Sequence, residues 1–143
     1  MKLYKLLLPL ILLISATNIY AADNVVITLD VNNIPSNKGH IMIYFYQNET
    51  EYIEESQPQH SFFFPAKQKN VSAKIEIPKG VYAVKIYHDE NENKILDKNS
   101  SNHPVEKFGY SNNYLGSYGK QPDFKNVLML IDKAEQVITI NMR

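Results

Sequence analysis

A polar segment, His88 to Asn99 (HDENENKILDKN), follows an alternating, strand-like sequence and carries the residues best suited to chemistry. Counted from Asp89, oxygen-bearing side chains occupy the first, third, fifth and ninth positions: Asp89, Asn91, Asn93 and Asp97. Ile95, at the seventh position, would contribute its backbone carbonyl. Alternate residues of a tightly curled loop can direct six to eight oxygens toward one hard cation, so this spacing predicts a calcium site.

Two positions differ from the full calcium loop of about twelve residues. Lys94 stands at the sixth position, where Gly normally makes the sharp turn, and Ser100 at the twelfth, where Glu normally completes the shell. Lys94 must then adopt a left-handed backbone or take a different turn. Glu106 is the nearest later carboxylate that could complete the shell, with Glu90 and Glu92 less favoured. The competing interpretation is a polar turn in which Asp and Asn side chains cap backbone N–H groups.

A hydrolytic site is a second alternative for the same region. His88, His103 and Ser111 supply a base and a nucleophile, and Asp97 with Glu106 could form an acid–base pair. Residue types alone do not establish a catalytic geometry. A hydrogen bond from His88 that holds the loop, together with metal ligation by the carboxylates, accounts for the same residues more economically, so we expect a non-catalytic protein.

The first residues predict export. Lys2 and Lys5 precede an apolar run of nine residues, LLLPLILLI, and then the small and polar stretch SATNIYAA. This order is typical of a secretory signal peptide, here residues 1–21. The run is shorter than the roughly 20 residues that cross a bilayer. We expect a periplasmic or secreted protein whose mature chain, residues 22–143, has no transmembrane segment.

Composition excludes several classes of protein. Without the signal peptide the 15 basic residues fall to 13 against 15 acidic ones, a net charge of −2, so no electrostatic footprint for nucleic acid remains. The absence of Cys excludes disulfides, thiol catalysis and thiolate metal sites. A chain of 143 residues with 44% hydrophobic residues is sufficient for one domain with a core.

The elements that must position the polar segment are short strands. Apolar and alternating runs lie at 25–31, 40–46, 62–64, 71–77, 81–88, 127–131 and 136–142, whereas 47–61 forms a surface connection or at most a short helix. The Pro78–Gly80 turn predicts a hairpin between 71–77 and 81–88, and a second hairpin is expected between the last two runs. About seven strands without long helices predict an all-β, antiparallel β-sandwich.

The connection from 88 to 126 is too long to be an idle loop in a compact domain. Tyr110, Tyr114 and Tyr118 recur in it at intervals of four, among Ser and Asn residues. Such rings can stack on a sugar or dock a partner. Alternatively they cover the open end of the sandwich, which we favour because aromatic residues in loops more often pack than bind.

Residues 78–131 resemble DUF2141, a family of exported bacterial proteins of unknown function. The resemblance is carried by Gly80, Tyr82, Ala83, His88, Asp89, Asn91, Asn93, Asp97, Pro104, Glu106, Gly109, Ser111, Asn112, Pro122 and Phe124. It implies an exported β-sandwich of transthyretin-like or immunoglobulin-like type, in which Tyr82 packs across the sheet edge. Members usually have Gly where this chain has Lys94, and the family brings no established activity.

Together these observations predict an exported, non-catalytic β-sandwich whose polar loop is organised by Ca²⁺. We expect a binding or structural role at the cell envelope, with an envelope protein or a glycan as partner. The alternative is a small periplasmic hydrolase that uses His88, Asp97 or Glu106.

Overall fold

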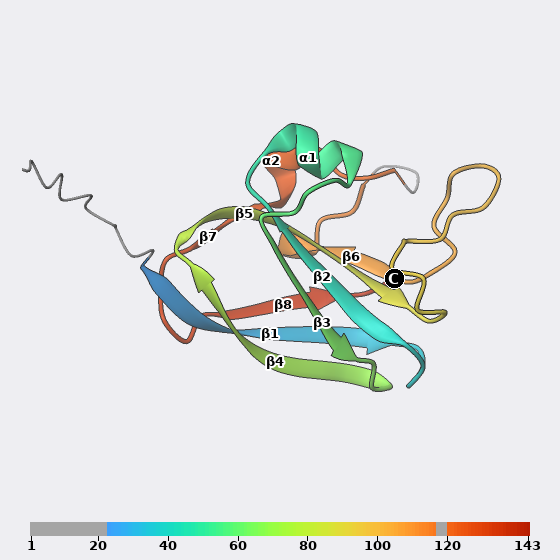
Figure 1. Cartoon of the computed structure of the whole chain (residues 1–143), viewed down its shortest axis with the longest axis horizontal. Helices are drawn as coiled ribbons and strands as arrows, with labels where there is room; N and C mark the ends of the chain where they lie inside the picture. Colours follow the sequence, from blue (N-terminus) through green and yellow to red (C-terminus); the bar gives the residue numbers. More distant parts are fainter. Residues whose placement is uncertain (1–22, 117–119) are drawn as a thin grey trace, which may run out of the picture.

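The computed structural model describes residues 23–116 and 120–143. Two β-sheets pack face to face, and two short helices lie on the outer side of one of them (Figure 1). The expected signal peptide, residues 1–21, and Tyr118 lie outside the described residues. Within the described ranges, no helix has the length and apolar character needed to cross a membrane.

The smaller sheet has the strand order β4-β1-β8. Its strands are β1 (Asn24–Ile34), β4 (Lys69–Pro78) and β8 (Val137–Asn141). β4 runs antiparallel to β1, whereas β8 runs parallel to it. The all-β sandwich is confirmed: residues 23–116 and 120–143 form eight strands, and their pairing is antiparallel except for this parallel pair.

The larger sheet is built around β5 (Gly80–Asp89). One edge of β5 pairs with β2 (His40–Tyr46), which continues to β3 (His60–Pro65). The other edge is shared: β6 (Phe108–Tyr110) pairs with its second half and β7 (Leu128–Ile131) with its first half. The remaining elements are α1 (Glu49–Glu54), the 3₁₀ turn η1 (Ser111–Asn113) and α2 (Phe124–Val127). The connection from 88 to 126 therefore contains regular structure as well as the loop.

The core between the sheets follows the period of two expected for half-buried strands. On β1 the alternating buried residues are Val25, Ile27, Leu29 and Val31, and Ile34 is buried beyond the register shift that follows Asn32. On β5 the inward residues include Tyr82, whose ring meets Phe45 edge-on at 5.8 Å and whose hydroxyl donates to the Pro78 carbonyl over 2.9 Å. Tyr82 is a packing residue, as the resemblance implied.

The predicted hairpin between 71–77 and 81–88 is wrong. β4 pairs only with β1, and β5 pairs with β2, β6 and β7, so the single residue Lys79 carries the chain from one sheet to the other. A two-residue hairpin turn needs a left-handed residue. Gly39 is the one glycine of the described segments with positive φ, and Gly80 therefore does not make such a turn.

The second predicted hairpin, between β7 and β8, is wrong as well. β7 joins the larger sheet and β8 the smaller one. The turn between them docks on β1, because Glu135 N donates to the Val26 carbonyl over 2.8 Å and Thr28 N donates to the Gln136 carbonyl over 2.9 Å. These hydrogen bonds place the start of β8 beside β1, with which it pairs.

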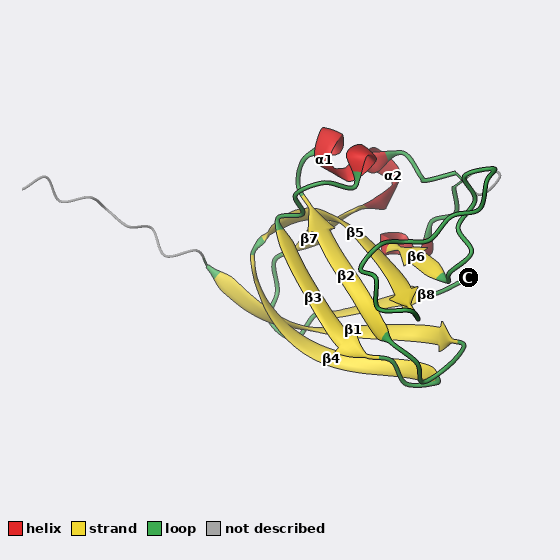
Figure 2. Ribbon diagram, turned by 45° about the vertical axis from the view of Figure 1, so that its right-hand side comes forward, coloured by secondary structure: helices red, strands yellow, loops and turns green. Residues whose placement is uncertain are grey.

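A second, smaller core covers the outer face of the larger sheet. Tyr52 of α1 and Val127 of α2 are fully buried there against Tyr110, and Leu96 packs with Tyr87 and Met42. Figure 2 shows both helices above the ends of β2 and β5, with the loops of the 88–126 connection beside them. These segments turn a sheet face that would otherwise meet water into an interior.

Candidate metal loop and the pocket beside it

The polar loop begins at a rigid base. His88 is fully buried at the end of β5, and its Nε2 lies 2.6 Å from the Lys38 carbonyl, which accepts the hydrogen bond. Gly39 packs so tightly against Asp89 that a Cβ atom there would lie 1.9 Å from the Asp89 carbonyl oxygen. The connection between β1 and β2 therefore clamps the strand end from which the loop departs.

Asp89 curls the loop through backbone hydrogen bonds. Its carboxylate is 1% exposed and accepts from Asn93 N at 3.1 Å and from Lys94 N at 2.9 Å. Lys94 has φ 64°, so it adopts the left-handed conformation that Gly takes in calcium loops, and its side chain is exposed. The substitution of Lys for Gly is accommodated without loss of the curl.

Asn91, Asn93 and Asp97 form one hydrogen-bonded network. The Asp97 carboxylate accepts from Asn91 Nδ2 at 2.7 Å and from Asn93 Nδ2 at 3.0 Å. The amide oxygens also serve the backbone: Asn91 Oδ1 accepts from Asn93 N and Asn93 Oδ1 from Ile95 N. Asn93 thereby links Asp89 to Asp97, and the spaced oxygen-bearing residues are near neighbours.

Glu106 closes the loop from the far side. Its Oε1 accepts from Glu90 N at 3.1 Å and its Oε2 from Asp97 N at 3.0 Å. One carboxylate therefore ties the start of the loop to its ninth position. Glu90 and Glu92 turn away, since Glu90 Oε1 accepts from Ser36 Oγ at 3.0 Å and Glu92 lies 3.4 Å from His40.

The donor set suits a hard cation only if amide and backbone oxygens take part. Across residues 23–116 and 120–143, no three His, Cys, Asp or Glu side chains gather closely enough to hold a metal by themselves. Asp89, Asp97 and Glu106 supply carboxylates, the two asparagines supply amide oxygens, and Ile95 supplies a carbonyl; its side chain is 63% exposed. Oxygen ligands of these kinds are those that Ca²⁺ prefers.

The residues proposed for hydrolysis have other partners. Ser111 is fully buried; its hydroxyl accepts from Val84 N at 2.9 Å and donates to the Val127 carbonyl, which fastens η1 to β5 and α2. His88 contacts the Lys38 carbonyl, and its other ring nitrogen lies 3.5 Å from Glu90. No hydrogen bond joins His88 to Asp97 or Glu106 within the described part of the chain.

The tyrosines of the 88–126 connection differ in exposure. Tyr110 is 5% exposed and packs edge-on against Tyr52 and Phe108, so its ring offers no open face for stacking. Tyr114 is 43% exposed. Tyr110 and Tyr114 therefore do not form one exposed stripe.

Sequence reasoning missed a charge cluster around one buried lysine, beside the loop. Lys85 lies on the outer face of β5 with its side chain 2% exposed, and its ammonium group contacts the Glu55 carboxylate. Lys98 contacts the same oxygen at 3.3 Å. Glu55 follows α1 in a left-handed conformation, φ 54°, after a helix that Asn48 caps by accepting from Glu51 N.

Burial and pairing shift the titration of this cluster. Burial lowers the pKa of Lys85, and the nearby Glu55 carboxylate offsets part of that effect. Burial alone would raise the pKa of Glu55, but Lys85 and then Lys98 outweigh it and leave that pKa below its ordinary value. Burial raises the pKa of Tyr110, which keeps its hydroxyl protonated at neutral pH.

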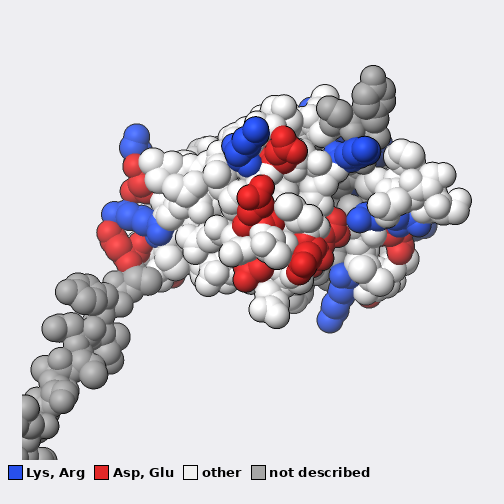
Figure 3. Space-filling model, turned by 90° about the horizontal axis from the view of Figure 1, so that it is seen from above, with Lys and Arg blue, Asp and Glu red and all other residues white. Residues whose placement is uncertain are grey.

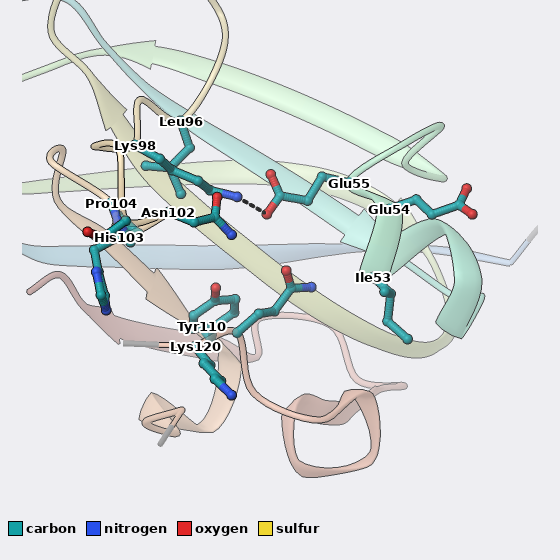
Figure 4. Close-up of a pocket in the computed structure, with 12 residues that line it drawn as sticks. Ile53, Glu54, Glu55, Leu96, Lys98, Asn102, His103, Pro104, Tyr110 and Lys120 are labelled. Carbon is teal, nitrogen blue, oxygen red and sulfur yellow. Dashed lines mark hydrogen bonds and ion pairs between the residues drawn. The ribbon is translucent and has the colours of Figure 1, made fainter. Parts of the chain in front are cut away.

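A pocket of about 580 Å³ opens between α1, residues 96–104 and residues 120–121 (Figure 4). Glu55 and Lys98 contact each other in one wall of the pocket, whereas the side chain of Glu54 points away from them. Figure 3 looks down on the molecule from the side that carries the helices and shows acidic groups near the middle of that face, with lysines around them. Charge of neither sign dominates this view.

Comparison with known proteins places the chain in a family. Neither the curated proteins nor the solved structures provide a match. The model of the family described as uncharacterized protein conserved in bacteria (DUF2141) matches residues 29–139, which include all the strands of the larger sheet and the polar loop. The chain therefore belongs to the DUF2141 family.

Proposed function

We propose that this protein is an exported, non-catalytic β-sandwich whose loop from Asp89 to Asp97 binds Ca²⁺, and that it acts as a binding or structural module at the cell envelope. The observation that carries the calcium proposal is the curl at Lys94. Its left-handed backbone donates an N–H to the buried Asp89 carboxylate, which gives alternate residues a common inner side.

The ligands would be side-chain oxygens of four loop residues, the Ile95 carbonyl and one oxygen of Glu106. The full set from the loop is Asp89, Asn91, Asn93 and Asp97. Both asparagines direct Nδ2 toward Asp97, so coordination requires these amides to turn their oxygens inward. Asp89, Asp97 and Glu106 bring negative charge to the proposed site, which favours a divalent cation.

Export and a structural ion are mutually supportive proposals. The N-terminal sequence has the order of a signal peptide, and the chain has no Cys for disulfides. An ion that binds only the folded state stabilises it by mass action. The buried position of His88 and the packing role of Ser111 support a non-catalytic assignment.

Thermal unfolding in Ca²⁺ and in chelator tests the proposal. At a calcium concentration about 100 times Kd, binding adds about 2.7 kcal/mol, roughly 10 °C in Tm for a domain of this size. Asp97→Ala should remove this shift. Because Asp89 also supports the apo fold, Asp89→Asn is judged by the difference between calcium and chelator and not by Tm alone.

Asp132→Ala is the matched control, since Asp132 is an exposed carboxylate in the turn between β7 and β8. It should leave the calcium shift unchanged. An equal Tm in calcium and chelator for the unmodified protein, or an equal shift in the Asp97 variant, would remove calcium from the proposal.

A further inference from the structure

We propose that the pocket between α1, residues 96–104 and Gln121 binds a mono- or disaccharide through its hydroxyl groups. The inference rests on the binding role proposed above and names its ligand class, but it does not depend on calcium. The cavity volume of about 580 Å³ lies within the range of small-molecule sites.

The lining favours a neutral polyol over an ion. Donors and acceptors reach the hollow from separate segments, including Ser101, Asn102 and Gln121. The Gln121 amide is fixed by donation from Nε2 to the Tyr52 carbonyl over 2.7 Å, which leaves its oxygen free for a ligand hydroxyl. The charged lining residues are two carboxylates and two ammonium groups, from Glu54, Glu55, Lys98 and Lys120, so their formal charges cancel and leave little net charge to attract an ion.

The contact between Glu55 and Lys98 supplies the central recognition element. A sugar hydroxyl both donates and accepts, and adjacent hydroxyls match a carboxylate beside an ammonium group. Lys85 holds Glu55 from the buried side, and the lowered pKa of Glu55 keeps the carboxylate ionised. The acceptor is therefore fixed before a ligand arrives, which reduces the entropic cost of binding.

Tyr110 provides a second, independent observation. The residue is 5% exposed, and it lines the pocket. Figure 4 shows that hydroxyl on the side of the ring toward Asn102. A phenolic hydroxyl both donates and accepts, so a ligand hydroxyl at this position would hydrogen-bond to it.

The pocket wall continues the polar loop. Leu96 is buried, and together with Lys98 it flanks Asp97 in the sequence and lines the hollow. A cation that fixes Asp97 would also fix these two wall residues. Sugar affinity should then be higher in calcium than in chelator, and linkage requires calcium affinity to rise equally when sugar is bound.

NMR titration of the ¹⁵N-labelled domain with neutral hexoses, N-acetylhexosamines and their disaccharides tests the inference. Amides of residues 96–104 and 121 should shift saturably at millimolar sugar. Tyr110→Phe removes only the hydroxyl and should weaken binding about three- to tenfold, the effect of one hydrogen bond. Lys98→Met should weaken it about tenfold or more, because a charged donor is lost.

Matched controls are Tyr114→Phe, an exposed tyrosine outside this pocket, and Lys133→Met, an exposed lysine of the distant β7–β8 turn. Both should bind like the unmodified protein. Absence of saturable shifts with every sugar, or equal weakening by Tyr110→Phe and Tyr114→Phe, would overturn the inference. If sugar binds but Tm does not depend on calcium, the calcium proposal is refuted and the sugar site stands. If Tm depends on calcium but no sugar binds, the sugar site is refuted and the calcium proposal stands.

Discussion

Removal of the carboxylate charge at Glu55 should destabilise the protein far more than its partial exposure suggests. Glu55→Gln leaves the Lys85 ammonium without its anion, in a site where the lysine side chain is 2% exposed. Breaking a fully buried ion pair costs about 3–5 kcal/mol. Because the Glu55 side chain is 30% exposed, water screens part of the interaction, and we expect a loss of about 2–3 kcal/mol.

The second substitution should restore most of that loss. Lys85→Met in the Glu55→Gln background removes the buried charge and keeps a long apolar side chain, and replacing both partners of a buried pair is often close to neutral. The double variant should therefore lie within about 1 kcal/mol of the unmodified protein. The double-mutant cycle should give a coupling free energy of about 2 kcal/mol.

Urea unfolding at pH 7 measures these free energies, with Glu54→Gln as a matched control because Glu54 is exposed and points away. The Glu55→Gln variant should also recover stability as the pH rises toward 10. Burial lowers the pKa of Lys85 in the folded state, so the folded protein loses this charge at a lower pH than the unfolded chain does. A loss no larger than that of the Glu54 control, with no coupling to Lys85, would refute the assignment of a buried pair.

Two further predictions concern acid stability and the base of the loop. Because the pKa of Glu55 is lowered in the folded state, its carboxylate contributes stability that is complete above pH 4.5, the ordinary pKa of the group, and is lost as the pH falls below that value. In urea unfolding between pH 5 and 3, the unfolding free energy of Glu55→Gln should therefore decline less steeply than that of the unmodified protein. Parallel declines would contradict this prediction. Gly39→Ala should cost about 3 kcal/mol of unfolding free energy, because it combines a left-handed backbone with a Cβ atom 1.9 Å from the Asp89 carbonyl oxygen. Gly80→Ala, whose Cβ would lie 2.8 Å from the flexible end of Gln47 and 3.0 Å from the Tyr82 ring but without a left-handed backbone, should cost less than Gly39→Ala in the same urea experiment, and equal costs would count against the clamp.

The buried face of 71–77 followed from sequence, but the partners of the strands did not. Alternation also predicts one inward face for 81–88, whereas every residue of β5 from Tyr82 to Asp89 is buried. Alternation carries no information about whether consecutive strands share a sheet. The hairpin predictions failed because backbone bonds from the turn at Glu135 to Val26, and the ordinary φ at Gly80, send the chain to the opposite sheet.

The curl of the polar loop was predictable because its oxygen-bearing residues are close in the sequence, whereas the charge cluster and the pocket depend on distant segments. Lys85, Glu55 and Lys98 come from three separate parts of the chain. One signal was present: Ala83 and Tyr87 flank Lys85 on the face of the strand opposite the one that carries Tyr82. Apolar residues on both faces of a strand indicate a cover on each, and here α1, α2 and the loop provide the second one.

The parallel pairing of β8 with β1 constrains the order in which the molecule can assemble. Asn32 and Asn141, joined by a side-chain hydrogen bond of 3.2 Å, are 109 positions apart. Loop closure over such a separation is entropically expensive and slows folding relative to proteins with local contacts. Until the final strand docks, one side of β1 keeps free N–H and C=O groups that could recruit another chain. Shielding of this nascent edge is thus a requirement for productive folding.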